Sequence, residues 1–272
     1  VTGGNSLILV DSADFEINVP GTPVAAYWVW SSRVILGSGD SFPDPVDNTL
    51  TVTGTRGDGA AIDTEITATI QEDSTFSGYI RSYAFVYSDN LFDFVSQGLN
   101  AYTISGIDVP AFEIPESHGA ALTIVYEADS CPYQHIDLAY GRDTCYHDWA
   151  PPFGPDSVVA CVAFAPATES RTLSYTVIVA GAAQPEVADA TRPSGFWTAA
   201  VNSPDGVPPA SLVGEAFATG IVDPFNSTPG LEWDIYSGQV TLAAGDNYAC
   251  FQAESPVGDG APGGISGAWL NL

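Results

Sequence analysis

Short runs of alternating apolar and polar residues recur along the whole chain and fix its fold class. Period-two alternation rich in β-branched residues is typical of half-buried strands, and helical periodicity is confined to two short stretches, 89–99 and 209–217. The chain's 27 glycines and 20 prolines gather between the runs, where they favour turns. The sequence therefore predicts an all-β fold, an antiparallel β-sandwich or jelly-roll-like barrel with long loops. The clearest strand runs are 49–53, 62–70, 122–126, 158–164 and 173–179.

The length of 272 residues suits one large β domain or two small ones. We find no fixed-period repeat and no low-complexity linker. The sequence favours a single domain over residues 1–272, with a possible internal boundary in the proline-containing stretch 184–194.

The charge of the chain is extreme because bases are missing. Six arginines and no lysine face 33 acidic residues, which gives a formal net charge of −27. Lysine chemistry such as Schiff-base catalysis or a P-loop phosphate site is excluded. Nucleic acid is excluded as a partner, because binding it needs a basic stripe.

The cysteines point to an oxidising compartment. The chain begins at Val1 and contains no methionine, which reads as a processed, exported form, and no segment approaches the ~20 apolar residues of a membrane span. Four cysteines in such a chain favour disulfides. Three connectivities are open; we favour Cys131 with Cys145 and Cys161 with Cys250. The expected location is extracellular or on the cell surface.

Three blocks carry a resemblance to a known family. They are "FEINVPGTPVAAYWVWSS" with "NTLTVTG", then "ALTIVYEADS" with "HIDLAYG", and finally "WDIYSGQVTLAAGDNYACFQAES" through "GAWLNL". Together they resemble secreted bacterial and archaeal cell-surface β-sandwich modules. The resemblance implies a structural module outside the cell and transfers no catalytic residue.

One loop gathers possible metal ligands. Cys131, His135, Cys145 and His147 offer two sulfurs and two imidazoles, but their spacing is not that of a usual zinc knuckle, so a disulfide is favoured over zinc. His135, Asp137 and His147 can also be read as the ligand set of non-haem iron oxygenases, although that set needs its second histidine on a distant strand.

Acidic loops suit calcium, which prefers hard oxygen ligands at short spacing. The candidate site is Asp40, Asp44 and Asp47, with weaker clusters at 11–16 and 89–93. None matches the twelve-residue EF-hand loop. Calcium is thus a possible cofactor, and no other cofactor is expected.

No nucleophile, base and orienting group assemble in the sequence. The "GSGDSFPD" block with Asp40 and Ser41 resembles an esterase nucleophile block, yet no histidine follows His147 to activate the serine. We therefore expect that the protein is not an enzyme. The rival interpretations are a carbohydrate-binding or adhesive module and a metal-dependent or glycoside-active enzyme. The adhesive module would use exposed tryptophans as stacking platforms: Trp28, Trp30, Trp149 or Trp197.

The N-terminal stretch suggests a mode of assembly. Leu7, Ile8, Leu9 and Val10 form an apolar run that is either an edge strand of its own subunit or a strand lent to a neighbour's sheet. Head-to-tail exchange of such a strand generates filaments. The predicted function is an extracellular structural protein that self-assembles into a cell-surface fibre or layer. Its expected partners are copies of itself, with a surface glycan as a second candidate. Asn226 begins the one Asn-x-Ser/Thr acceptor for N-linked sugar.

Overall fold

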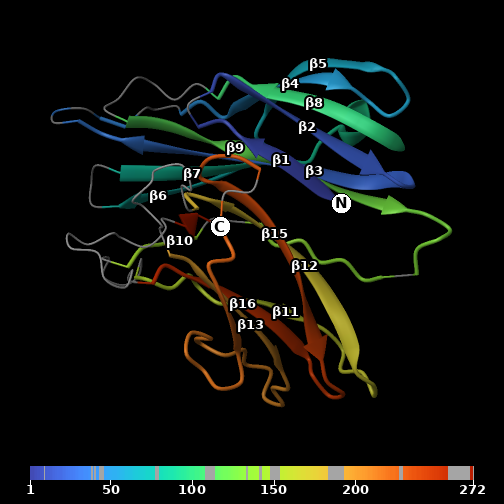
Figure 1. Ribbon diagram of the computed structural model, residues 1–272, viewed down its shortest axis with the longest axis vertical. Helices are drawn as coiled ribbons and strands as arrows, with labels where there is room; N and C mark the ends of the chain where they lie inside the picture. The colour runs from blue at the N-terminus through green and yellow to red at the C-terminus, as the bar shows by residue number, and fades with distance from the viewer. Residues whose placement is uncertain are drawn as a thin grey trace. The chain divides into compact units, whose positions relative to one another are not determined.

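The computed structural model of the protein is built almost entirely of antiparallel strands (Figure 1). In the described part of the chain the one helical element is the 3-10 turn η1, Leu91–Asp93, so the helix expected at 209–217 does not form. The sheets are open, with edge strands, which confirms the all-β, sandwich-like class and not a closed barrel. The structure describes residues 1–8, 10–37, 39, 41–42, 46–76, 80–107, 114–132, 134–140, 143–147, 154–182, 193–226, 229–256 and 270–271.

The chain divides into two compact units, where the sequence favoured a single domain. The first unit is Val1–Arg142 with Pro229–Trp233, and the second is Asp143–Thr228 with Asp234–Leu272. The boundary expected at 184–194 lies almost wholly outside the described residues. The strands are β1 Thr2–Ser6, β2 Ser12–Val19, β3 Thr22–Ile35, β4 Thr49–Thr55, β5 Ala61–Thr67, β6 Ile70–Phe76, β7 Ile80–Tyr87, β8 Gly98–Ser105, β9 Ile114–Glu127, β10 Thr144–Cys145, β11 Ala160–Ala163, β12 Arg171–Ala180, β13 Gly195–Val201, β14 Thr219–Val222, β15 Trp233–Leu242, β16 Tyr248–Glu254 and β17 Leu270–Asn271.

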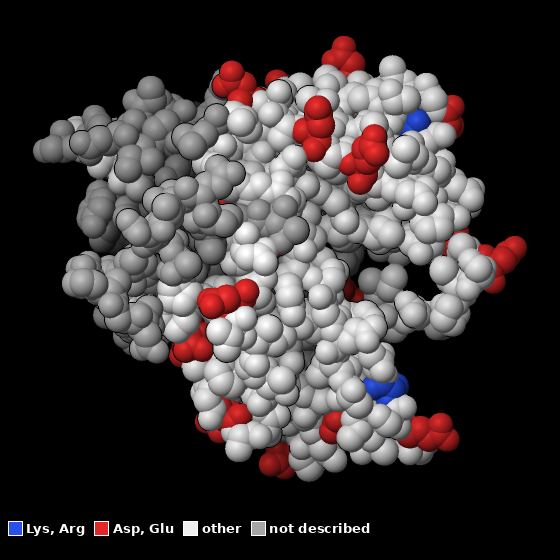
Figure 2. Space-filling model, viewed as in Figure 1, with Lys and Arg blue, Asp and Glu red and all other residues white. Residues whose placement is uncertain are grey.

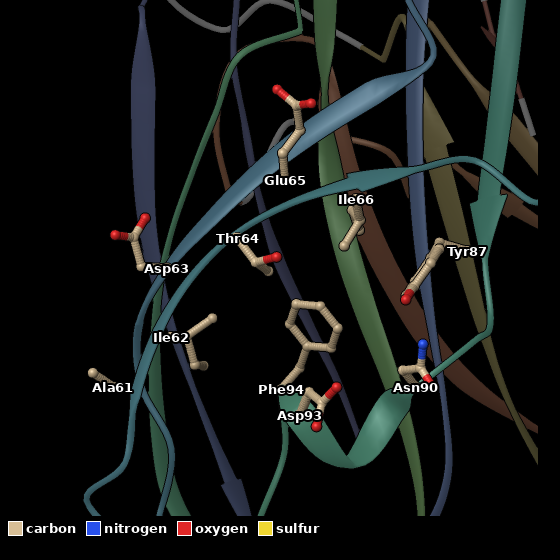
Figure 3. Close-up of a pocket in the computed structure, with 10 residues that line it drawn as sticks. All are labelled: Ala61, Ile62, Asp63, Thr64, Glu65, Ile66, Tyr87, Asn90, Asp93 and Phe94. Atoms are coloured by element: carbon tan, nitrogen blue, oxygen red, sulfur yellow. The ribbon is translucent and has the colours of Figure 1, made fainter.

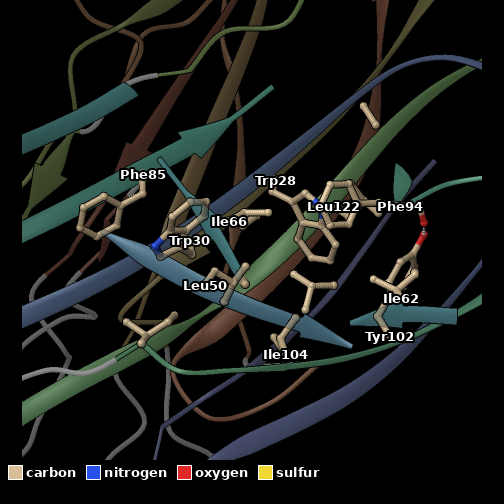
Figure 4. Close-up of a cluster of buried hydrophobic side chains, with 14 of the residues drawn as sticks. Trp28, Trp30, Leu50, Ile62, Ile66, Phe85, Phe94, Tyr102, Ile104 and Leu122 are labelled. Carbon is tan, nitrogen blue, oxygen red and sulfur yellow. Dashed lines mark hydrogen bonds between the residues drawn. The ribbon is translucent and has the colours of Figure 1, made fainter. Parts of the chain in front are cut away.

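The first unit packs two sheets, in the orders β1-β9-β3-β7-β6 and β2-β8-β4-β5, around a large apolar core. Alternation along β3 turns Trp28 and Trp30 into that core, where they are 0% and 1% exposed (Figure 4). Trp28 meets Tyr102 edge to face, with ring centroids 5.5 Å apart. Burial of such large aromatic side chains supplies roughly 1.5–3 kcal/mol each. The one cysteine of this unit, Cys131, is a free thiol, so no disulfide supplements the core.

A short segment from late in the sequence belongs to the first unit. Ser6 donates its hydroxyl to the Leu231 carbonyl at 2.6 Å. Glu232 is buried with a left-handed φ of 52°, and its carboxylate lies 3.8 Å from the buried Arg33 guanidinium. Both charges are thereby compensated inside the unit.

The second unit consists of the sheets β11-β16-β13-β14 and β10-β17-β12-β15. Its smaller core is aromatic: Phe196 stacks on Phe251 and meets Phe225 edge to face. Cys161 on β11 and Cys250 on β16 are register partners, and they form a disulfide. That half of the cysteine prediction is confirmed, and the bond fastens an edge strand to its neighbour.

The other cysteine pair is wrong. Cys131 is an exposed free thiol in the first unit, with its sulfur 3.9 Å from the Tyr126 hydroxyl. Cys145 is fully buried in β10 of the second unit, and burial raises the pKa of its thiol. The two residues belong to different compact units, so their short spacing in the sequence misled the prediction.

The N-terminal strand lies earlier than expected, at Thr2–Ser6, and pairs with β9 of its own chain at the edge of the sheet. Leu7 and Ile8 follow it into the interior, Val10 is half exposed, and Leu9 lies outside the described residues. A Cβ at Gly4 would overlap the Ala120 carbonyl oxygen. The position beside β9 that β1 occupies, here called the β9 slot, therefore admits only glycine at residue 4. Within one chain, β1 is an edge strand; its exchange between copies stays a prediction.

Candidate functional site

A groove of about 320 Å³ lies beside β5 in the first unit (Figure 3). Apolar and aromatic side chains converge on its centre: Ile66 comes from β5, Phe94 follows η1 and Tyr87 ends β7. Tyr87 and Phe94 meet edge to face at 6.0 Å. The lining residues are Ala61, Ile62, Asp63, Thr64, Glu65, Ile66, Tyr87, Asn90, Asp93 and Phe94.

The acidic residues of the groove stand at its rim. Asp63 and Glu65 are exposed and point away from Phe94 in Figure 3, because alternation along β5 turns Ile62 and Ile66 inward instead. Desolvation raises the pKa of the Tyr87 hydroxyl, with the nearby Asp89 and Asp93 charges adding to the shift. The Asp63 and Glu65 carboxylates point in different directions in Figure 3, and neither points towards Phe94 at the centre of the groove.

The predicted metal ligands are not brought together. In the described part of the chain no group of three or more His, Cys, Asp or Glu side chains could hold a metal ion. His135 approaches Asp137 at 3.1 Å on the surface of the first unit. Cys145 and His147 belong to the second unit, where the His147 ring lies against Tyr146.

The calcium candidate is tested only in part by the structure. The Asp47 carboxylate accepts hydrogen bonds from the Thr49 amide at 2.9 Å and the Thr49 hydroxyl at 2.7 Å. It thus shapes the turn into β4. Asp40 and Asp44 lie outside the described residues, so calcium binding stays a prediction.

Two of the expected tryptophan platforms are wrong. Trp28 and Trp30 are buried in the core and cannot stack on a sugar. Trp197 is half buried and donates its indole N–H to the Glu254 carboxylate at 2.7 Å, and Trp149 lies outside the described residues. Glycan binding stays a prediction.

Asn226, the candidate glycosylation site, has an exposed side chain. Its backbone amide donates to the buried Asp234 carboxylate at 2.7 Å. The acceptor's Ser227 and Thr228 lie outside the described residues, so attachment of sugar there stays a prediction.

The sheet edges differ in charge, which the sequence analysis missed. Of the four edge strands of the first unit, β1 carries no charged residue and the other three are acidic. In the first unit the edge strands β2, β5 and β6 all carry exposed carboxylates, and we name these the acidic edges. In the second unit β11 and β14 stand at the two edges of one sheet and contain no charged residue, and we name these the open edges. Figure 2 shows acidic side chains scattered over the viewed face with very few basic ones. The exposed carboxylates of the acidic edges are Asp14, Glu16, Asp63, Glu65, Glu72 and Asp73.

Apolar side chains are exposed at the open edges. Val222, the last residue of β14, is 84% exposed, and Val158, two residues before β11, is 75% exposed. Edge strands present unpaired N–H and C=O groups to solvent, and charged side chains are the usual means of preventing another strand from adding there. The open edges lack that protection.

No known protein family and no curated protein matches the chain. Two solved structures align with it. One is PNGase F, a glycosylasparaginase from Flavobacterium meningosepticum, at 12% identity and a TM-score of 0.26, covering 100% of this chain and 94% of that one. The other is a peptide-N(4)-(N-acetyl-β-D-glucosaminyl) asparagine amidase, at 12% identity and a TM-score of 0.26, covering 93% and 96%.

These neighbours are enzymes, and they contradict the expectation that this chain is not one; that expectation does not stand. A similarity at this TM-score and identity assigns neither their reaction nor any catalytic residue to this chain.

In the described residues, no helix is long and apolar enough to cross a membrane.

Proposed function

We propose that this protein is an extracellular structural subunit that associates with copies of itself through sheet edges, building a cell-surface fibre or layer. The observation that carries the proposal is the contrast between the acidic edges and the open edges. A chain of net charge −27 repels its own copies, so contact is least unfavourable where no carboxylate lies. The open edges meet that condition.

The disulfide supports the same function. Cys161 holds the open edge β11 against β16, so this strand cannot peel away when a second copy pairs with it. Disulfides persist in oxidising surroundings such as the outside of a cell. A surface fibre or layer needs subunits whose contact strands keep their position.

The N-terminal strand offers a second route to the same assembly. In exchange, β1 of one copy would fill the β9 slot of another and repeat the contacts that it makes in its own chain. The β9 slot accepts only a strand with glycine at this position, because the backbone of Ala120 lies close to Gly4. Residues 7–11, which join β1 to β2 in the other sheet, would then cross between copies.

Electron microscopy of negatively stained protein, paired with sedimentation velocity over a range of concentrations, tests the proposal. We expect polymers or layers that grow with protein concentration. Addition of a chelator separates calcium-bridged contacts, which would dissolve, from strand-mediated contacts, which would not. Monomers at high concentration, with and without calcium, would contradict the proposal.

A further inference from the structure

Resting on the proposed function, we infer that β14 of one copy pairs antiparallel with β11 of a second copy. The four-stranded sheet β11-β16-β13-β14 then continues from copy to copy. The partner of each open edge is the other open edge of an identical chain.

Strand directions make this pairing compatible with copies in the same orientation. β11 is antiparallel to β16, β16 to β13, and β13 to β14, so β14 runs opposite to β11. A neighbour placed beside β14 without being turned over therefore presents its β11 in the antiparallel sense. Such a contact joins two different surfaces and does not close on itself, so it extends into a fibre.

The two open edges also match in length. β11 and β14 have four residues each, and in the centred register Val222 lies opposite Ala160 while Thr219 lies opposite Ala163. Side chains on both strands are small or β-branched, so they leave the backbones accessible. A ladder of four residues is short, and we expect assembly to depend steeply on protein concentration.

Charged groups bound the edge of β11 without entering it. The Asp143 carboxylate accepts a hydrogen bond from the Val158 amide, ahead of the strand. Beyond the strand, Arg171 donates to the Ala165 carbonyl at 2.8 Å. The stretch Ala160–Ala163 lies between these two contacts.

The carboxylate nearest β14 is turned back onto its own sheet. Asp223 follows the strand directly with a left-handed φ of 47°, and its side chain accepts the Ser194 amide at 2.9 Å. Its own amide donates to the Ser194 carbonyl at 2.7 Å. These two bonds hold the acid away from the side on which a second copy would add.

Other edges fit this role less well. The acidic edges would place carboxylates of two copies against each other, which is unfavourable. β15 is the edge of the second sheet of this unit, and its exposed Ser237, Gln239 and Thr241 are uncharged. The opposite edge of that sheet is β10, which has two residues. If copies were stacked in the same orientation along this sheet, β15 of one copy would pair with β10 of the next at only two positions.

Mixing of two variants tests the inference. Val222→Asp blocks β14 and Ala160→Asp blocks β11, and both positions are exposed, so the fold should be retained. We expect each variant alone to raise the critical concentration for assembly at least about tenfold. An equimolar mixture should give dimers, since one variant keeps β11 and the other keeps β14. Gln239→Glu on β15 is the matched control and should assemble like the wild type.

The outcomes separate this inference from the proposed function. If both single variants still polymerise, the edge pairing is wrong while self-assembly stands. If Val222→Asp blocks assembly and Ala160→Asp does not, β14 pairs with itself and the head-to-tail arrangement is overturned. If the wild type does not assemble at any concentration, the proposed function fails and the inference fails with it.

Discussion

The two units of the protein differ in the size of their cores, in the presence of a disulfide and in the charge of their edge strands. The first unit has a large core around Trp28 and Trp30 and carboxylates along three of its edge strands. The second has a smaller aromatic core, the Cys161–Cys250 disulfide, and a sheet whose two edges carry no charge. Carboxylates thus oppose the addition of another strand at three edges of the first unit, whereas no charged residue does so along β11 and β14 of the second.

The largest effect is expected from a substitution that disrupts the core of the first unit. Trp28→Ala should lower the free energy of unfolding by about 3–5 kcal/mol, because it leaves a cavity at a fully buried position. Denaturant unfolding followed by circular dichroism measures the loss. Phe92→Ala, at a side chain that is 62% exposed, is the control and should change little. A loss below about 1 kcal/mol for Trp28→Ala would mean that the core does not dominate this unit.

Removal of the disulfide tests whether the second unit depends on a covalent link. Replacement of Cys161 and Cys250 together by alanine should cost about 2–4 kcal/mol, because the bond spans 89 residues and restrains the unfolded chain. Calorimetric melting compares the double variant with Cys131→Ala, which removes an exposed free thiol. Equal melting of the two variants would contradict the assigned role of the bond.

Gly4→Val tests whether the N-terminal strand β1 serves its own chain or a second copy. The new side chain would collide with the Ala120 backbone, and we expect a loss of about 1–3 kcal/mol. Ser12→Val, at an exposed position of β2, is the control. If β1 serves only its own chain, assembly of the folded variant is unchanged; if β1 is exchanged, assembly is lost as well. Sedimentation of the folded variant decides between these two routes.

The smallest effect concerns pH. Burial, with the Glu254 charge nearby, raises the pKa of the Asp156 carboxyl above its unfolded value of 3.8. The folded state therefore holds this proton more tightly, and the second unit loses stability as the pH rises from 3.8 through the raised pKa. Asp156→Asn should remove this decline and stabilise the unit by less than about 1 kcal/mol at neutral pH, since the group is partly solvated. Melting at acid and neutral pH, with Asp205→Asn as the exposed control, measures it.

The features that the sequence predicted correctly are those that depend on the local pattern of residues. Alternation identified strands such as 49–53 and 173–179, which lie in β4 and β12. It did not identify β3 or show that Trp28 and Trp30 would be buried there. Cys161 and Cys250 were paired correctly because each lies in a recognisable strand. Cys131 and Cys145 were paired by spacing alone, which says nothing about the division into units.

Edge positions could not be predicted, because they depend on strand pairing over long range. The sequences of β11 and β14 look like core strands until β16 and β13 are known to pair with them on one side only. The N-terminal strand was placed too late because Leu7 and Ile8 read as strand residues, whereas they anchor the end of a strand that contains Gly3 and Gly4. Glycine is generally unfavourable in strands. At position 4, however, the neighbouring Ala120 backbone lies so close that only glycine fits.

Hydrogen exchange of assembled and dispersed wild-type protein shows which strands pair between copies. We expect that amides of 160–163 and 219–222 gain protection on assembly, because they enter a ladder between copies, while those of the acidic edge 61–67 do not change. Protection gained at 61–67 with none at the open edges would contradict it.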